Sequence, residues 1–234
     1  MDKILVTGSN GLLGQKLIYN LLERGNYEVY ATARGENRIV VKEGYTFLPL
    51  DITNSEAVEK IFDQVKPDVV INTAAMTNVD QCEADKKACW DINVQAVAHL
   101  VEACETHNAH LIHLSTDFVF DGENGPYREE DAPNPLHYYA ESKLASEKIL
   151  QESNIHWSIA RTIIIYGIVE GMSRSNLVLW TKNSIDNKQQ INVVNDQYRS
   201  PTLAEDLAEG CMLIAEKKAY GIYHLSGPET HMIT

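Results

Sequence analysis

The sequence contains only four cysteines, and none of them belongs to a CxxC pair. Cys82, Cys89, Cys104 and Cys211 also lack a nearby histidine pattern, so their spacing excludes the common zinc-binding frameworks. A small disulfide-stapled protein would need many more cysteines for its length, so we expect reduced thiols packed in the interior. The cysteines therefore predict neither a metal site nor a disulfide framework.

Long apolar runs and an excess of basic residues are also missing. No run approaches the length of a membrane span, and Met1-Asp2-Lys3 leads into an apolar segment without a signal-peptide core. We therefore expect a cytoplasmic protein. With 20 basic against 33 acidic residues, the formal charge is -13, which argues against broad binding to nucleic acid or an anionic membrane. The composition favours a small-molecule ligand.

Residues 3 to 22 contain a short apolar run, a glycine-rich turn and an amphipathic segment, in that order. This pattern is typical of turns that bind a dinucleotide pyrophosphate. Glycine permits the tight bend, the close approach of backbone to phosphate and the packing of helix on sheet. Free N–H groups at a helix N-terminus also favour an anion. The predicted cofactor contacts in this turn are Gly8, Asn10, Gly11, Leu12, Leu13 and Gly14.

Segments with the period of strands alternate with segments with the period of helices along most of the chain. The continuous run Val69-Val70-Ile71 is typical of a strand buried on both faces of a parallel sheet. We predict an α/β fold, a Rossmann-type doubly wound parallel sheet over residues 1–165, with a small interleaved substrate-binding lobe over 166–234. Predicted strands cover 4–6, 28–32, 47–50, 69–71, 111–114, 156–161, 191–194 and 222–225, and predicted helices cover 12–22, 55–65, 86–105, 139–151, 176–187 and 203–216.

Two packing expectations concern the middle of the chain. The predicted helix 86–105 carries an apolar stripe that we expect in the core or at a subunit interface. Its members are Trp90, Val94, Val97, Val101 and Cys104. We also expect His110 and His113 to share one face of the next strand and to serve packing rather than catalysis.

The ends of the predicted strands indicate which cofactor is bound. An acidic residue after the second strand suits the ribose 2′-hydroxyl of NAD, whereas a basic residue suits the 2′-phosphate of NADP. Arg34 lies there, with no carboxylate before Glu36. We therefore predict NADPH, with NADH as the alternative. The other predicted cofactor contacts at strand ends are Asp51, Ile52, Ala74 and Ala75.

Tyr139 and Lys143 are four residues apart near the start of a predicted helix, so they share one of its faces. An ammonium beside a phenol lowers the pKa of the tyrosine toward the range useful for proton transfer. Thr116 follows the strand 111–114, and open parallel sheets bind ligands outside the carboxyl ends of their strands. The predicted catalytic residues are Thr116, Tyr139 and Lys143, and the neighbouring Tyr138 is expected to pack.

The order and spacing of these motifs resemble the extended short-chain dehydrogenases/reductases. The pattern is most similar to the dTDP-4-dehydrorhamnose reductases, over residues 3 to about 229. The motifs that carry the resemblance are Gly8-x-x-Gly11-x-x-Gly14, Asn72-Thr73-Ala74-Ala75, residues 115–122 (STDFVFDG), Tyr139-x-x-x-Lys143, Arg161-Thr162 with Tyr166-Gly167, and Asp196-Gln197-Tyr198 with Ser200-Pro201-Thr202.

The resemblance implies NADPH-dependent reduction of a 4-keto nucleotide-sugar in nucleotide-sugar biosynthesis. Thr116 would hydrogen-bond the substrate carbonyl oxygen, Tyr139 would donate the proton, and Lys143 would hold the nicotinamide ribose. Asn93 would support the active-site strand. Asn176 and residues 197–202 would face the nucleotide-sugar. The same resemblance leaves homodimer formation open.

Three departures from the family pattern stand out. Arg199 and Ala140 replace usual glycines, and Arg199 would add a bulky cation beside the predicted sugar site. Ala140 should be harmless, because alanine is a better helix former than glycine. The sequence stops at Thr234 where the family continues, so we expect a substrate lobe that is truncated at its C-terminus.

Two other functions stay open on the same fold. One is a non-catalytic regulatory subunit resembling methionine adenosyltransferase β, which would bind the cofactor and a partner enzyme without reducing a sugar. The other is a nucleotide-sugar epimerase or dehydratase, which would retain NAD without net oxidation. Arg34 and the Thr116-Asp117 pair favour the reductase over both.

Overall fold

A parallel sheet of seven strands forms the centre of the molecule, in the order β10-β6-β5-β4-β1-β2-β3. The computed structural model describes residues 1–172 and 176–232. Every paired strand in this sheet runs parallel to its neighbour. Its strands are β1 (Asp2–Thr7), β2 (Tyr27–Ala33), β3 (Thr46–Pro49), β4 (Val69–Asn72), β5 (His110–Thr116), β6 (Trp157–Thr162) and β10 (Gly221–His224). The strand order reverses between β1 and β4, which is where such sheets bind dinucleotides.

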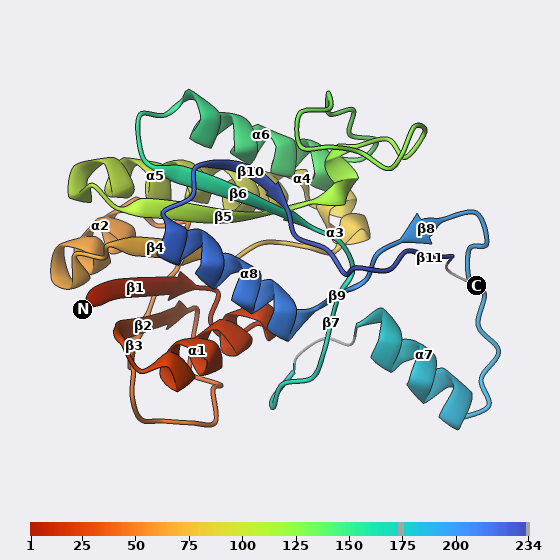
Figure 1. Cartoon of the computed structure of the whole chain (residues 1–234), viewed down its shortest axis with the longest axis horizontal. Helices are drawn as coiled ribbons and strands as arrows, with labels where there is room; N and C mark the ends of the chain where they lie inside the picture. The colour runs from red at the N-terminus through yellow and green to blue at the C-terminus, as the bar shows by residue number, and fades with distance from the viewer. Residues whose placement is uncertain (173–175, 233–234) are drawn as a thin grey trace.

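Helices cover both faces of the sheet (Figure 1). On one face α1 (Leu12–Arg24) packs beside α8 (Ala204–Lys217), and their apolar residues form a core with Ile4 and Val6. On the other face α2 (Ser55–Val65), α5 (Ala96–His107) and α6 (Tyr138–Glu152) contribute to a second core with Leu5. Neighbouring residues of β1 point to opposite faces, so each core receives alternate side chains. The predicted doubly wound Rossmann-type architecture is confirmed.

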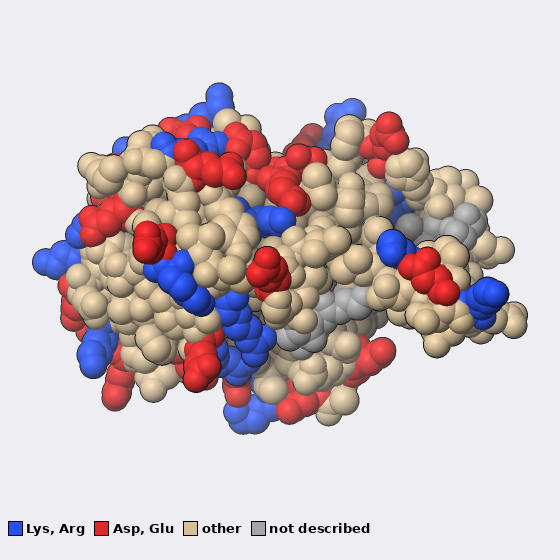
Figure 2. Space-filling view, turned by 90° about the horizontal axis from the view of Figure 1, so that it is seen from below, with Lys and Arg blue, Asp and Glu red and all other residues tan. Residues whose placement is uncertain are grey.

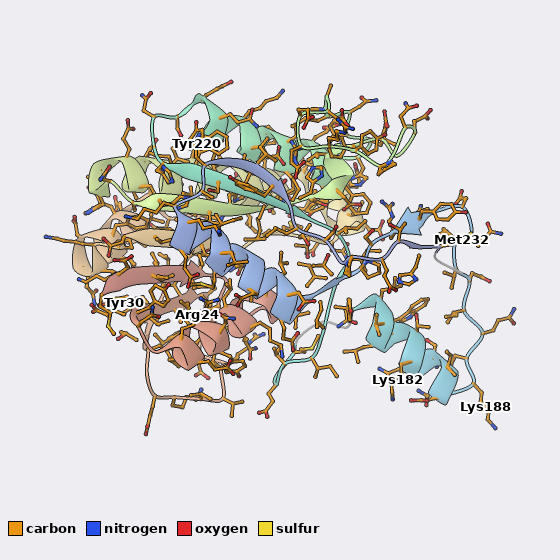
Figure 3. All side chains as sticks on the ribbon, viewed as in Figure 1. Arg24, Tyr30, Lys182, Lys188, Tyr220 and Met232 are labelled. Carbon is orange, nitrogen blue, oxygen red and sulfur yellow. The ribbon has the colours of Figure 1, made fainter. Side chains whose placement is uncertain are left out.

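Charges on the helix surfaces are paired rather than gathered by sign. On the face shown in Figure 2, acidic and basic side chains are interspersed. Arg24 at the end of α1 contacts Glu209 of α8 at 2.6 Å, and it also pairs with Glu216 (Figure 3). None of the helices in the described part of the chain has the length and apolar character to cross a membrane.

The long helix predicted at 86–105 is interrupted. The structure has α3 (Val79–Ala84), α4 (Lys86–Trp90), a π-helical turn at Asp91–Gln95, and then α5. Val94, Val97, Val101 and Cys104 are buried in the core, but Trp90 is 36% exposed, so a core position for Trp90 is wrong. The wider π turn breaks the regular helical period, so Trp90 precedes the break and leaves the stripe.

The chain after β6 departs most from expectation. The strand predicted at 191–194 is absent there, and β8 (Tyr198–Arg199) pairs instead with β11 (His231–Met232). Val193 and Val194 are exposed, so their preference for strands was not enough to form one without packing against neighbouring side chains. The remaining elements are β7 (Ile165–Tyr166), α7 (Leu177–Asp186) and β9 (Thr202–Leu203), and β7 pairs with β9. Figure 1 shows α7 beyond the edge of the helical layers, whereas α8 and β10 rejoin the main sheet.

Candidate active site

The glycine turn after β1 is packed too tightly for side chains at two of its three positions. Gly8 has a φ of +68°, and a Cβ there would lie 2.7 Å from the Ala74 backbone nitrogen. A Cβ on Gly14 would lie 2.4 Å from the Gly8 carbonyl oxygen. Glycine at position 8 therefore meets the conformational need of the turn, and at position 14 it allows α1 to approach the turn closely.

The N-terminus of α1 fits a bound pyrophosphate. Its N-cap is Gly11, which has no capping side chain, and the first turn contains no acidic residue. The first N–H groups of a helix otherwise have no partner within it, and they carry the positive end of the helix dipole. Leu13 lies in the core, so only its backbone faces this end. Asn10 binds the backbone of residues 36 and 38, which ties the turn to the loop after β2.

A cavity of about 460 Å³ lies at the end of β2. Arg34, the residue predicted to contact the 2′-phosphate of a dinucleotide, lines this cavity. Asp51 accepts hydrogen bonds from the Thr53 backbone at 3.0 Å and from its hydroxyl at 2.8 Å, and Ile52 is buried beside them. The complete lining is Arg34, Thr53, Ala88, Asp91, Ile92 and Gln95. Of these residues the sequence predicted only Arg34, and the last three lie on the π turn that replaces part of the expected helix.

Helix α6 and strand β5 bring the three predicted catalytic residues together. Thr116 ends β5 and caps a short 3₁₀ turn, where its hydroxyl accepts from the Phe118 N–H at 3.2 Å. His137 caps α6, so Tyr139 lies in the first turn of the helix and Lys143 lies one turn later. The Thr116 hydroxyl lies close enough to Tyr139 to lower the pKa of the phenol. A hydroxyl and a phenol therefore lie close together at the carboxyl edge of the sheet, and the amine of Lys143 is carried one turn further along α6.

Tyr139 is a buried phenol, only 8% exposed. Burial raises the pKa of Tyr139, while the neighbouring Thr116 hydroxyl acts in the opposite direction and the charge of Asp117 adds to the increase. This direction is the reverse of the one expected from Lys143 alone, because desolvation disfavours the phenolate. The phenol therefore keeps its proton at neutral pH, as a proton donor must.

Lys143 is 2% exposed, and burial lowers its pKa to about 8. The carboxylate of Glu147, one turn further along α6, works against this decrease. The Lys143 amine contacts His113 of β5, with Nζ 3.0 Å from His113 Nε2. Sequence reasoning missed this contact, because it placed His113 on the same face as His110. Residues three apart on a strand point to opposite faces, and His110 instead contacts Ser158 of β6.

Two buried side chains, Asn93 and Glu147, connect α6 to neighbouring segments. The Asn93 carboxamide accepts from the Met76 N–H at 2.8 Å and donates to the Met76 carbonyl and the Ser142 hydroxyl, both at 3.0 Å. It therefore links the segment after β4 to α6. Glu147 accepts from Arg161 Nη2 at 2.7 Å, which links α6 to β6.

The comparisons with known proteins agree with this geometry. A family model described as the RmlD substrate binding domain matches residues 1–233. The chain belongs to this family. A dTDP-4-dehydrorhamnose reductase from Aggregatibacter actinomycetemcomitans is 37% identical over 234 residues, covering 97% of this chain and 74% of that protein. The methionine adenosyltransferase 2 subunit beta of Bos taurus is 35% identical over 233 residues, covering 97% and 67%.

One solved structure with a similar fold contains a bound cofactor. The dTDP-4-dehydrorhamnose reductase from Bacillus anthracis strain Ames, in complex with NADP, superimposes with a TM-score of 0.86 and 29% sequence identity. The match covers 99% of this chain and 76% of that one. The resemblance inferred from the motifs is therefore confirmed.

Arg199, one of the departures from the RmlD-family pattern, contacts the residue that follows Thr116. Its guanidinium contacts Asp117 Oδ2 at 2.8 Å and lies over the Phe118 ring, 5.2 Å from its centre. It also donates to the Gln197 side chain at 3.0 Å. Asp117 is the residue after Thr116, so Arg199 lies beside the site as expected. Ala140 is buried in α6 without interrupting it.

Proposed function

We propose that this chain is an NADPH-dependent reductase of a 4-keto nucleotide-sugar, similar to the dTDP-4-dehydrorhamnose reductases and acting in nucleotide-sugar biosynthesis. The observation that carries the proposal is the proximity of Thr116 and Tyr139, with Lys143 one turn along the same helix, at the sheet edge that also holds the glycine turn and Arg34. A hydroxyl and a neutral phenol are the groups that can bind and protonate a carbonyl oxygen. The 37% identical reductase adds support.

The residues that would hold NADPH lie along the carboxyl edge of the sheet. Gly8, Gly11 and Gly14 leave the helix N-terminus open to the pyrophosphate, and Arg34 would pair with the 2′-phosphate. NADPH supplies the hydride when it is bound. NADH is the alternative donor. The other residues proposed to contact the cofactor are Asn10, Leu12, Leu13, Asp51, Ile52, Ala74, Ala75, Tyr139 and Lys143.

Each catalytic side chain has a distinct role in this proposal. Thr116 donates a hydrogen bond to the substrate carbonyl oxygen and orients it. Tyr139 donates its phenolic proton to the same oxygen as negative charge develops there. The Lys143 ammonium holds the nicotinamide ribose and stabilises the resulting phenolate electrostatically. Burial of all three side chains keeps water away and strengthens these interactions.

The substrate side of the proposal rests on residues 166–234, as a lobe interleaved with the main sheet. Asn176 caps α7 and donates to the Gly167 carbonyl at 2.8 Å, which fixes the start of that helix. Asn176 and residues 197–202 are proposed to face the nucleotide-sugar. Two further expectations stay predictions: homodimer formation and a cytoplasmic location.

A cofactor and substrate screen tests the proposed reaction. Purified chain is mixed with NADPH or NADH and a set of 4-keto nucleotide-sugars, and absorbance at the reduced-nicotinamide band is followed. We expect oxidation of NADPH that depends on the keto-sugar and is faster than with NADH. Tight NADPH binding without oxidation by any keto-sugar would contradict the reductase proposal.

The methionine adenosyltransferase β alternative is favoured by one observation, the 35% identity to the Bos taurus subunit. That outcome would combine NADPH binding, no keto-sugar reduction and co-purification with a methionine adenosyltransferase catalytic subunit. The screen and a pull-down with that subunit therefore separate the two functions.

Replacing Arg34 by alanine is expected to reduce the preference for NADPH over NADH by about tenfold. A hydrogen bond to a charged group contributes about 1.5–3 kcal/mol, and the exposure of Arg34 favours the lower end. The measurement is kcat/KM for each cofactor. Arg128→Ala removes an exposed arginine outside this cavity and serves as the control. An unaltered ratio in Arg34→Ala would show that another residue selects the cofactor.

A further inference from the structure

A row of buried polar side chains crosses three neighbouring strands beneath the proposed active site. Thr7, Asn72 and His113 occupy matching register positions on β1, β4 and β5, which lie side by side in Figure 1. Each is at most 1% exposed. The Thr7 hydroxyl donates to Asn72 Oδ1 at 2.6 Å, and Asn72 Nδ2 lies 3.0 Å from His113 Nδ1. His113 is therefore held from the sheet side by a continuous hydrogen-bonded row.

The row determines which nitrogen of His113 carries the proton. The Ala74 N–H, which can only donate, points to Asn72 Oδ1 at 3.3 Å and so directs Asn72 Nδ2 toward the imidazole. Nδ1 must then accept. Burial and the neighbouring Lys143 keep the pKa of His113 well below its usual value, so the ring is neutral and its proton is on Nε2.

The Nε2–H group faces two partners on α6. One is the Ser146 hydroxyl at 3.0 Å, which itself donates to the Lys143 carbonyl and so has lone pairs free to accept. The other is Lys143 Nζ, also at 3.0 Å. A lysine ammonium can only donate, so in this position it would place N–H groups against another N–H. The contact suits the neutral amine and disfavours the ammonium.

We propose that His113 is a positioning residue for Lys143, which it controls by presenting Nε2–H to the amine. This inference rests on the reductase function proposed above. The inward position holds a neutral amine, and the ammonium form is favoured only when Nζ turns away from His113 toward Tyr139 and the proposed ribose site. Because of His113, the protonation state of Lys143 depends on whether the Lys143 side chain points toward His113 or toward Tyr139.

The other ionisable groups around Lys143 come from three elements. Glu147 lies on α6 itself and favours the ammonium, and Cys89 of α4 acts in the same direction as a weaker influence. Tyr139 also lies on α6. Arg161 of β6 is paired with Glu147 and reduces the effect of that carboxylate. Among these groups, His113 is the one hydrogen-bonded to Nζ.

The first experiment determines the protonation state and tautomer of His113 without measuring enzyme activity. Protein labelled with ¹⁵N-histidine is titrated by NMR, and the His113 signals are assigned by their loss in His113→Gln. We expect a neutral ring protonated at Nε2, with an Nε2 shift that moves as the neighbouring amine titrates near pH 8. Lys143→Met should abolish that movement. A ring protonated at Nδ1, or an Nε2 shift unaffected by Lys143→Met, would overturn the proposal.

The second experiment follows the protonation state of Lys143 through the pH dependence of the rate of NADPH oxidation. In the unaltered protein, the rate should fall as pH rises through about 8, because Lys143 loses its proton. In His113→Gln, the new side chain can present an oxygen to Lys143 Nζ. In His113→Asn, the new side chain keeps a hydrogen-bond partner for Asn72 but removes the Nε2–H group. Both changes stabilise the ammonium, so we expect the alkaline limb to move upward by about one pH unit, the order of a charged hydrogen bond.

His110→Gln is the matched control, since it alters another buried histidine of β5 that faces away from Lys143. The alkaline limb of the pH–rate profile of His110→Gln should lie at the same pH as in the unaltered protein. Thermal unfolding and NADPH affinity confirm that each variant is folded. An unmoved limb in both His113→Gln and His113→Asn would overturn the inference. Absence of all reduction in the unaltered protein would instead refute the reductase function, while the NMR titration would still decide the state of His113.

Discussion

Tyr139→Phe is expected to lower keto-sugar reduction by about a hundredfold to ten-thousandfold, the range typical for removal of a general acid. The substitution removes only the phenolic oxygen, and the ring can keep its place beside Phe118 and His137. Because the cofactor is proposed to bind mainly through the glycine turn and Arg34, its dissociation constant should change little. The measurements are kcat/KM for the keto-sugar and the NADPH dissociation constant.

The adjacent Tyr138 provides the matched control. Its ring lies against Trp90, with 6.3 Å between the ring centres, and Lys86 lies over its face. Tyr138→Phe should therefore retain nearly full activity. Equal turnover in Tyr139→Phe and the unaltered protein would remove Tyr139 from its proposed role.

Glu147→Gln is expected to lower the free energy of unfolding by about 3–5 kcal/mol. Glu147 is fully buried, and its carboxylate pairs with the equally inaccessible Arg161 and accepts from the Ser115 hydroxyl. Loss of the negative charge leaves a buried guanidinium without a charged partner. The change should appear as a lower midpoint in urea unfolding.

Two further variants separate a buried-charge effect from a general effect of mutating α6. Glu152→Gln alters an exposed carboxylate at the end of the same helix and should change stability by no more than about 0.5 kcal/mol. Glu147→Leu combined with Arg161→Met removes both charges and should recover much of the loss, because an apolar pair avoids the desolvation cost. If Glu147→Gln were as stable as Glu152→Gln, the pair would not stabilise the junction of α6 and β6.

The parts of the fold that could be predicted depend on local chemistry. The glycine turn follows from the conformation and close packing that Gly8 and Gly14 must adopt, and both requirements are met in the structure. The continuous apolar run of β4 requires burial on both faces, which only a covered parallel sheet offers. Tyr139 and Lys143 share a face because helix geometry places residues four apart in line.

The parts that could not be predicted depend on contacts between distant segments. The π turn at Asp91–Gln95 has no strong local signal, yet it moves Trp90 out of the core and places Asp91 and Gln95 in the cavity beside Arg34. The strand predicted at 191–194 is wrong, because Val193 and Val194 are exposed and pair with no strand in the described part of the chain. The upward direction of the Tyr139 pKa depends on burial, which only the assembled site reveals.

The contact between His113 and Lys143 illustrates the same limit. A strand periodicity counted correctly would have put His113 on the face opposite His110, but it could not have identified α6 as the element covering that face. The register of β1, β4 and β5 then aligns Thr7 and Asn72 with His113. The resulting row is a property of the sheet, and no single segment of the sequence specifies it.

Hydride transfer from the cofactor to the sugar is the most direct measurement of the proposed function. The purified chain is incubated with a 4-keto nucleotide-sugar and NADPH carrying deuterium at the transferable position of the nicotinamide, and the product is examined by mass spectrometry and NMR. We predict one deuterium on the former carbonyl carbon, with product formation largely lost in Tyr139→Phe. Product without deuterium, or no product while NADPH is bound, would contradict reduction by this active site.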